Sequence, residues 1–262
     1  MIKYVAWILR LIFPFLRYYP WILRVSRNPQ KYPLAYRYNM VRLIAIKFLQ
    51  IARVDVNVKN LPLYKPGQRY YIVGNHVSFL DPVVVVATHE SPITFASKIE
   101  AAKFPIVGRI LKILDCVFLE RGNLKQEISM MQTIKKSLVK GDRSWAIFPE
   151  GTRNKDYFRE LGEFKGGSFK LPVATNTTIL PIAIWGTQTI LPTRVFWRRY
   201  PVYIHYLPAL DVAPFDGNTI KIAEHTRALI QNEVTQMRDD YLIQTKYYAK
   251  GKDFTQYLVP KD

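Results

Sequence analysis

The feature that most constrains the fold is a regular alternation of short apolar runs with longer segments of helical periodicity. Each apolar run has four to eight residues and ends at a turn signal, which is typical of a buried strand. Strands alternating with helices predict an α/β fold, with a mostly parallel or mixed central sheet flanked by helices. The predicted strands are 69–73, 93–96, 116–119, 144–148, 178–185 and 200–206, and the predicted helices are 78–89, 104–114, 125–139 and 219–237.

The N-terminal segment differs from the rest of the chain in being both basic and apolar. Residues 1–60 contain 11 Lys or Arg and one acidic residue, Asp55, so more than half of the net charge of +18 lies there. Four of the basic residues recur every seven positions among large apolar side chains, which keeps them near one stripe of a helix. These four are Lys3, Arg10, Arg17 and Arg24.

A second amphipathic stretch runs from about residue 34 to residue 52, after a turn marked by Pro29 and Pro33. The two stretches predict a helical hairpin over residues 1–53, in which Pro14 and Pro20 are expected to kink or break the first helix. We therefore predict three parts: the hairpin at 1–53, an α/β domain at 54–212, and a C-terminal helix and tail at 213–262. The last helix is expected to begin at Asn218 or Thr219 and to loosen from residue 239.

The hairpin is expected to lie on a membrane surface. No charge-free run approaches the ~20 residues that span a bilayer, whereas a basic amphipathic segment rich in Trp and Phe is typical of an interfacial helix. A signal peptide is not expected, because Arg10 interrupts the apolar stretch. Two alternatives stay open: the helices pack only on the globular domain, or one of them crosses the membrane at a tilt.

The chain's charge and its cysteine content restrict its partners and its environment. A positive excess favours anionic partners, and a basic arm that is also apolar favours an anionic membrane surface over nucleic acid. Cys116 is the only cysteine, so an intramolecular disulfide is impossible, and a reducing compartment is expected. Together these features predict a location at the cytoplasmic face of a membrane. Cys116 itself lies in an apolar run and is interpreted as a core residue.

His76 and Asp81 directly follow the first predicted strand, within residues 75–81. Ligands of α/β proteins gather at the carboxyl ends of strands, so His76 is expected at the ligand-binding edge. If Asp81 holds one ring nitrogen of His76, the other nitrogen can take a proton from a hydroxyl group. A structural alternative stays open, because Ser78 and Asp81 also have the spacing of a helix capping box.

Further basic residues follow other predicted strands. Residues 148–153 read Phe-Pro-Glu-Gly-Thr-Arg, in which Gly151 allows a tight turn and Arg153 can bind a phosphate. Shortly afterwards, Lys165 stands beside two glycines whose backbone N–H groups are accessible. Arg121 ends the run Phe-Leu-Glu-Arg at residues 118–121. Taken one at a time, these residues fit turns and surface ion pairs, but together they predict a phosphate-binding edge.

The combined pattern resembles the glycerolipid acyltransferase family, and within it the 1-acyl-sn-glycerol-3-phosphate acyltransferases. The matching blocks are residues 75–81, 118–121, 148–153 and 180–182, and the resemblance covers about residues 70–185. It implies an acyl donor, which is acyl-CoA or an acidic acyl-carrier protein, and a lysophosphatidic acid acceptor that becomes phosphatidic acid. It implies no metal and no cofactor beyond that cosubstrate.

The resemblance also implies roles for individual residues. His76 and Asp81 are the expected catalytic pair, and the acceptor phosphate is expected to bind to Arg121, Arg153 and Lys98. Backbone N–H groups near Gly151 are expected to hold the oxyanion. The residues expected to shape the site are Asn75, Glu150, Gly151, Thr152, Lys165 and Gly166.

Other functions remain open at this level. A related enzyme could act on glycerol-3-phosphate or on another lysolipid. A non-catalytic protein could bind membranes or nucleic acid through its basic residues, including those at 194–199. A serine hydrolase is disfavoured, because the chain has no G-x-S-x-G sequence.

Overall fold

The central sheet of the protein orders its strands β1-β7-β6-β2-β5-β3-β4. The structure is a computed structural model, which describes residues 2–65, 67–119, 124–154, 160–191 and 199–248. Neighbouring strands are parallel except for β6 and β7, which are antiparallel, so the sheet is mixed. The strands are β1 (Val54–Lys59), β2 (Tyr71–Gly74), β3 (Ile93–Lys98), β4 (Val117–Leu119), β5 (Ser144–Ile147), β6 (Ile179–Trp185) and β7 (Tyr200–Tyr206).

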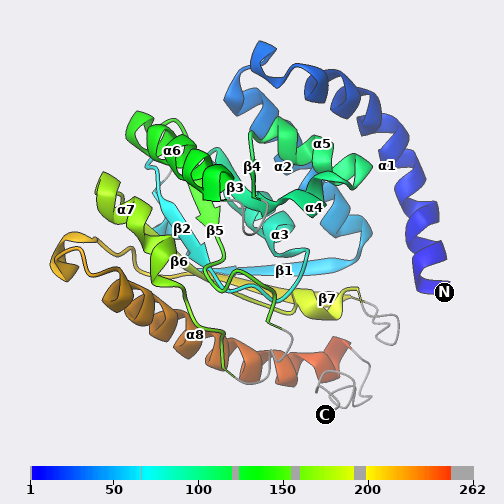
Figure 1. Cartoon of the computed structure of the whole chain (residues 1–262). Coiled ribbons are helices and arrows are strands. Elements are labelled where there is room, and N and C mark those ends of the chain that lie inside the picture. Colours follow the sequence, from blue (N-terminus) through cyan, green and yellow to red (C-terminus); the bar gives the residue numbers. More distant parts are fainter. Residues whose placement is uncertain (1, 66, 120–123, 155–159, 192–198, 249–262) are drawn as a thin grey trace.

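Helices cover both faces of this sheet, as the alternating sequence pattern predicts (Figure 1). One face carries α2 (Leu34–Ile51), α3 (Asp81–Thr88) and α5 (Pro105–Ile113), and the other carries α6 (Leu124–Lys140), α7 (Lys170–Thr175) and α8 (Thr219–Tyr248). The short α4 (Ile99–Ala102) precedes α5. Because both faces are covered, β2, β6 and β7 are buried along their whole length.

Most predicted elements occur within a few residues of their expected bounds, and the α/β fold class is confirmed. The structure adds β1, α4 and α7, which were not predicted. Asn218 is the residue that caps α8, since its Oδ1 accepts hydrogen bonds from the N–H groups of Ile220 at 3.2 Å and Lys221 at 3.1 Å. The expectation of a loose tail from residue 239 is wrong for residues 239–248, because α8 continues to Tyr248 and buries Tyr241, while residues 249–262 lie outside the described part of the chain.

The N-terminal hairpin consists of α1 (Ile2–Arg27) and α2, joined by the short 3₁₀ turn η1 (Pro29–Lys31). Of the two outcomes expected at Pro14 and Pro20, the break is wrong, because α1 is continuous, whereas a bend agrees with the arc that α1 follows in Figure 1. Helix α1 contacts α5, while α2 contacts α3 and α5, so the hairpin packs against the domain. In the part of the chain that the structure describes, no helix combines the length and the apolar character needed to cross a membrane.

A buried ion-pair network attaches α2 to the start of β4. The Arg37 side chain is only 3% exposed, and its guanidinium donates to both carboxylate oxygens of Asp115 at 2.9 Å. Arg143 donates to the same carboxylate at 2.7 Å. Although burial favours the neutral acid, these hydrogen bonds hold the pKa of the Asp115 carboxyl below its ordinary value. The hairpin is therefore fixed to the domain by charge as well as by apolar packing.

Candidate active site

A loop between β2 and α3 brings His76 and Asp81 together. His76 Nδ1 lies 2.8 Å from Asp81 Oδ2, and the same oxygen accepts the backbone N–H groups of Val77 and Ser78, each at 2.8 Å. The Asp81 side chain is fully buried, whereas that of His76 is 19% exposed. Since a carboxylate only accepts hydrogen bonds, Nδ1 carries the hydrogen and Nε2 has the lone pair that a base needs.

Asp81 also makes part of the capping-box contacts that the sequence left open as an alternative. Asp81 is the first residue of α3, and its carboxylate accepts the N–H of Ser78, three residues earlier. The Ser78 hydroxyl accepts the N–H of Leu80 at 3.3 Å, so the box is only half formed. A single carboxylate thus both shapes the turn and holds the imidazole, and the two readings are compatible.

Strand β6 anchors the loop from one side through Asn75 and Thr187. The Asn75 amide exchanges two hydrogen bonds with the backbone of Ile184, at 2.8 and 2.9 Å. The Thr187 hydroxyl donates to Asp81 Oδ1 at 2.5 Å. Thr187 was not among the predicted site residues. Its position directly after the predicted strand at 178–185 and Gly186 was the available signal, because that strand also ends at the ligand-binding edge.

Strand β5 anchors the loop from the other side through Glu150. Its carboxylate accepts the N–H of His76 at 2.7 Å and that of Gly162 at 3.0 Å. Burial raises the pKa of the Glu150 carboxyl, and the two backbone hydrogen bonds oppose that shift. The Phe148 ring stacks on the imidazole with centroids 4.4 Å apart and an angle of 19° between the planes. Both faces of the loop therefore have defined contacts.

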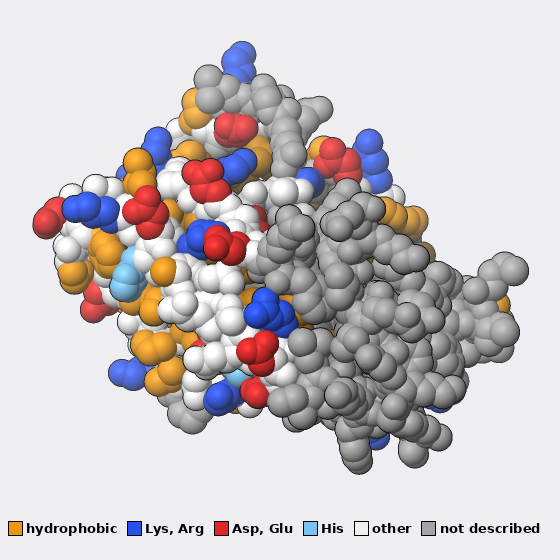
Figure 2. Space-filling view, turned by 90° about the horizontal axis from the view of Figure 1, so that it is seen from below, with side chains coloured by type: hydrophobic (Ala, Val, Ile, Leu, Met, Phe, Trp, Pro, Cys, Tyr) orange, Lys and Arg blue, Asp and Glu red, His pale blue; other side chains and the backbone are white. Residues whose placement is uncertain are grey.

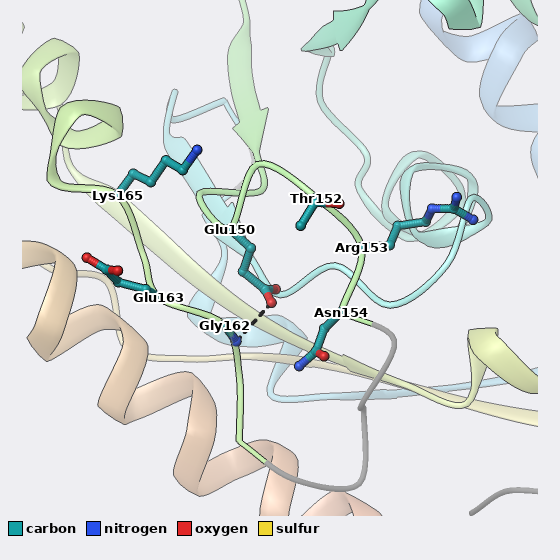
Figure 3. A pocket seen from close by; sticks show the side chains of 7 residues that line it. All are labelled: Glu150, Thr152, Arg153, Asn154, Gly162, Glu163 and Lys165. Atoms are coloured by element: carbon teal, nitrogen blue, oxygen red, sulfur yellow. Dashed lines mark hydrogen bonds between the residues drawn. The ribbon is translucent and has the colours of Figure 1, made fainter. Parts of the chain in front are cut away.

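An open pocket of about 470 Å³ lies beside this loop (Figure 3). Arg153 and Lys165 stand on opposite sides of the pocket, and Glu150 lies between them, directed toward Gly162. Arg153 and Lys165 are the side chains of the pocket that can bind a phosphate, and the carboxylates of Glu150 and Glu163 line the same pocket. The lining residues are Glu150, Thr152, Arg153, Asn154, Gly162, Glu163 and Lys165.

The two cations are positioned by neighbouring residues that sequence reasoning had assigned other roles or none. The Arg153 guanidinium lies 3.6 Å from the centroid of the Phe79 ring, which is itself 61% exposed. Gly151 has a φ of +67°, and a Cβ built on it would lie 3.3 Å from Lys165 Nζ. The absence of a side chain at residue 151 therefore leaves room for the ammonium group.

Lys98 and Gly166, two of the predicted site residues, are not among the residues that line the pocket. Lys98 is exposed at the carboxyl end of β3, two strands from β2 in the sheet, and is not among the pocket's lining residues. Gly166 opens the 3₁₀ turn η3 (Gly166–Phe169) immediately after Lys165. Arg121 lies outside the described residues. The roles proposed for Lys98 and Arg121 in phosphate binding stay predictions.

Among the backbone N–H groups near Gly151 that were expected to hold the oxyanion, the N–H of Gly151 itself is already hydrogen-bonded. The backbone N–H of Gly151 donates to the carbonyl of Phe148 at 3.0 Å, so it is engaged in the turn. An oxyanion donor near Gly151 stays a prediction for the neighbouring N–H groups. Cys116 is buried, and burial raises the pKa of its thiol to about 11, which agrees with its interpretation as a core residue.

The geometry defines a His–carboxylate pair beside a pocket lined by two cations and two glutamates, at the carboxyl edge of an α/β sheet. Residues 55–185, half of the chain, match the model of the Acyltransferase family. The chain is 32% identical over 189 residues to a probable 1-acyl-sn-glycerol-3-phosphate acyltransferase of Mycoplasma genitalium, an alignment that covers 68% of this chain and 69% of the relative. The chain therefore belongs to the acyltransferase family.

Other similarities agree in family and fold. A probable 1-acyl-sn-glycerol-3-phosphate acyltransferase of Mycoplasma pneumoniae is 32% identical over 61% of this chain and 60% of its own length. A protein of Borreliella burgdorferi with the same name, without "probable", is 30% identical over 64% of this chain and 62% of its own length. The chain thus spans between 60% and 69% of the length of these relatives.

A solved structure shares the fold. The crystal structure of the 1-acyl-sn-glycerophosphate (LPA) acyltransferase PlsC from Thermotoga maritima superimposes with a TM-score of 0.70. The match covers 91% of this chain and 98% of that chain, at 22% sequence identity. The predicted fold class and family resemblance are both confirmed.

Proposed function

We propose that this protein transfers a fatty acyl group from a thioester to the sn-2 hydroxyl of 1-acyl-sn-glycerol-3-phosphate, giving phosphatidic acid. The observation that carries the proposal is the His76–Asp81 hydrogen bond of 2.8 Å beside a pocket lined by Arg153 and Lys165. A base and a phosphate site side by side suit an acceptor that carries both a hydroxyl and a phosphate. The names of the relatives point to the same acceptor.

The proposed reaction needs no covalent intermediate with the enzyme. His76 Nε2 takes the proton of the acceptor hydroxyl while its oxygen attacks the thioester carbonyl carbon. Asp81 stabilises the resulting imidazolium and keeps the ring in place. When the tetrahedral intermediate collapses, the carbon–sulfur bond breaks and the thiolate leaves, taking up the proton from His76. The products are the new ester and a free thiol, and no metal or redox cofactor takes part.

Acceptor binding is assigned to the cationic side chains of the edge. Arg153 and Lys165 would neutralise the phosphate and fix its distance from His76, so that the hydroxyl is held near the base. Lys98 and Arg121 are proposed as further phosphate contacts. The donor is acyl-CoA or acyl-carrier protein, both of which are anionic and suit the basic chain.

We also propose that the protein works on the anionic surface at the cytoplasmic face of a membrane. Exposed apolar side chains on α1 include Val5 at 53%, Ile12 at 47% and Leu16 at 66% exposed. Helix α5, which contacts α1, adds Ile106 and Val107 at 39% and 47%. On the described part of the face near α8, acidic and basic side chains are interspersed, and the basic ones do not gather into one continuous patch (Figure 2).

The catalytic assignment is tested by acyl transfer in liposomes with two donors and several acceptors. His76→Ala should abolish the release of free thiol that depends on acceptor, whereas His225→Ala, which changes an exposed histidine on α8, should not. Substantial thioester-dependent transfer by His76→Ala contradicts the base assignment. A preference for glycerol-3-phosphate or another lysolipid changes the acceptor. No thiol release with any pair would leave a basic membrane-binding protein.

The acceptor site is tested by Arg153→Ala. This change should raise the acceptor KM more than it lowers kcat, because Arg153 contributes binding and not proton transfer. Lys170→Ala, an exposed cation at the start of α7 outside the pocket, serves as control. An unchanged acceptor KM removes Arg153 from the phosphate site.

The membrane assignment is tested by binding to anionic liposomes. Leu16→Glu places a charge on the exposed side of α1 and should weaken binding severalfold, because burying that charge in the interface is costly. Val139→Glu is a matched control, since Val139 is 72% exposed but lies on α6. Equal binding by both variants and the wild type contradicts the role of α1.

A further inference from the structure

The turn that follows β6 is unusually constrained. Its residues Thr187, Gln188 and Thr189 are 0%, 8% and 2% exposed. Gly186 begins the turn with a φ of +95°, and a Cβ there would lie 2.4 Å from the carbonyl oxygen of Pro201. The Gly186 N–H donates to Gln188 Oε1 at 3.0 Å, and its carbonyl accepts the Thr189 hydroxyl at 2.7 Å. The strained Gly186 backbone and its hydrogen bond with Gln188 hold Thr187 in a fixed position, whereas the Thr189 hydroxyl closes the end of the turn and accepts the Tyr241 hydroxyl at 3.1 Å.

The Thr187 hydroxyl is aimed at the catalytic carboxylate. It donates to Asp81 Oδ1 at 2.5 Å, across 106 residues of sequence, and both side chains are fully buried. Asp81 Oδ2 already accepts His76 Nδ1–H and two backbone N–H groups. Thr187 is thus the hydrogen-bond donor found on Oδ1 among the described residues.

From this geometry we infer that Thr187 is a positioning residue of the acyl transfer, which acts through Asp81 to fix the His76 imidazole. The inference rests on the proposed function and adds a residue to its site. With Oδ1 held by Thr187, the plane of the carboxylate cannot rotate about its Cβ–Cγ bond. A fixed plane keeps Oδ2 directed at Nδ1, which in turn keeps Nε2 directed at the acceptor hydroxyl.

A purely local role for this hydroxyl is less consistent with its contacts. Threonine hydroxyls in turns commonly bind backbone groups a few residues away, as Thr189 does with Gly186. Thr187 stands in the same turn, yet its hydroxyl binds a carboxylate on another element. This difference between two neighbouring threonines provides the control for the experiment.

The test compares three variants of the full chain in detergent micelles and liposomes. Thr187→Val removes the hydroxyl at nearly constant volume, Thr187→Ser keeps it, and Thr189→Val removes the neighbouring hydroxyl without touching Asp81. We expect Thr187→Val to lower kcat by roughly tenfold with little change in either KM, because a hydrogen bond to a charged group orients the base. Thr187→Ser should restore kcat to within about twofold of the wild type, since it keeps the donor.

A second readout does not depend on substrate. The low-field proton NMR signal of His76 Nδ1–H, assigned by its loss in His76→Ala, should move in Thr187→Val and stay in place in Thr189→Val. This separates the inference from the proposed function: a moved signal supports the positioning role even if wild-type protein transfers no acyl group to lysophosphatidic acid. Should Thr187→Val fail to fold, Thr187→Ala takes its place in both assays.

Three results overturn the inference. The first is a Thr187→Val protein whose His76 signal and kcat both equal those of the wild type. The second is a Thr189→Val protein with the same kinetic and spectral changes as Thr187→Val, which would assign the effect to the turn as a whole. A lowered kcat that Thr187→Ser fails to restore also contradicts a role for the hydroxyl.

Discussion

Replacing Glu150 by glutamine tests how the loop that carries His76 is held. The Glu150 carboxylate accepts two backbone N–H groups, from His76 at 2.7 Å and Gly162 at 3.0 Å, and the residue is 7% exposed. A glutamine amide has one oxygen and one NH₂ group. In Glu150→Gln, one of the two N–H groups must therefore face another donor, and it loses its hydrogen bond inside the protein.

The size of the effect follows from two opposing terms. A buried donor left without a partner costs about 1–3 kcal/mol. Burial raises the pKa of the Glu150 carboxyl, so removing its charge recovers part of that cost. We therefore expect a net loss of about 1 kcal/mol in the free energy of unfolding, or about 2–4 °C in Tm for a chain of this size.

Activity should respond more strongly than stability. If the N–H of His76 loses its acceptor, the imidazole moves relative to the acceptor hydroxyl, and a misplacement of about 1 Å can lower the rate about a hundredfold. Thermal unfolding and phosphatidic acid formation are measured on Glu150→Gln and on Glu163→Gln, an exposed glutamate that lines the same pocket. A Glu150→Gln protein with wild-type kcat, or an equal loss in Glu163→Gln, refutes the reasoning.

Three further changes test other parts of the structure. Phe79→Leu removes the ring beneath Arg153 and should raise the acceptor KM about two- to fivefold, with kcat nearly unchanged, in steady-state assays. Asp115→Asn should lower Tm at neutral pH, because the folded protein holds the Asp115 carboxyl at a pKa below its ordinary value of 3.8 and the charged group therefore stabilises the folded state above pH 3.8. As the pH falls below 3.8 toward the folded-state pKa, this stabilisation is lost, and the difference in Tm from the wild type should shrink. A constant difference in Tm down to pH 2 contradicts this argument. Gly186→Ala places a Cβ against the Pro201 carbonyl and should abolish soluble expression, whereas a stable Gly186→Ala protein contradicts the tight turn.

The sequence predicts the elements whose pattern is local. Strands β5 and β6 are apolar runs between turn signals, so their periodicity is visible in the chain. Strand β1 reads Val-Asp-Val-Asn-Val-Lys and pairs at the edge of the sheet with β7, 146 residues away in register at Val54 and Tyr200. This alternation is the period of a half-buried strand, yet the segment was not among the predicted strands, and its pairing with β7 could not be read from the sequence.

The continuity and the length of two helices also depend on contacts that the local sequence does not show. A proline in a helix predicts a kink or a break from local geometry, and α1 passes through Pro14 and Pro20 as a continuous, curved helix. Similarly, residues 240–248 mix polar side chains with Tyr, Leu and Ile and were expected to be loose, but Tyr241 is fully buried against β6 and β7, near Trp185 and Tyr203. Contacts with distant residues, which the sequence does not reveal, extend α8.

In the candidate site too, residues in local motifs could be predicted, whereas residues with distant partners could not. His76, Asp81 and Arg153 could be predicted because each stands in a short motif directly after a strand. Thr187 could not be assigned, because its partner is 106 residues away and no spacing links the two. For the same reason His205 showed no partner in the sequence, although its Nδ1 lies 2.5 Å from the Glu233 carboxylate on α8.

The order of the strands explains why these distant residues form one site. Strand β2 lies between β6 and β5, and all three are parallel, so their carboxyl ends meet at one edge. Each neighbour then supplies one anchor for the loop that carries the base: Thr187 after β6 and Glu150 after β5. Because both anchors end in buried hydrogen bonds, the position of His76 is set by the sheet itself. The pocket shares the buried anchor Glu150, but Thr152, Arg153, Glu163 and Lys165 line it as exposed side chains on the segments after β5. If the pocket binds the acceptor, as proposed, changes of acceptor can arise at these exposed positions without moving the base.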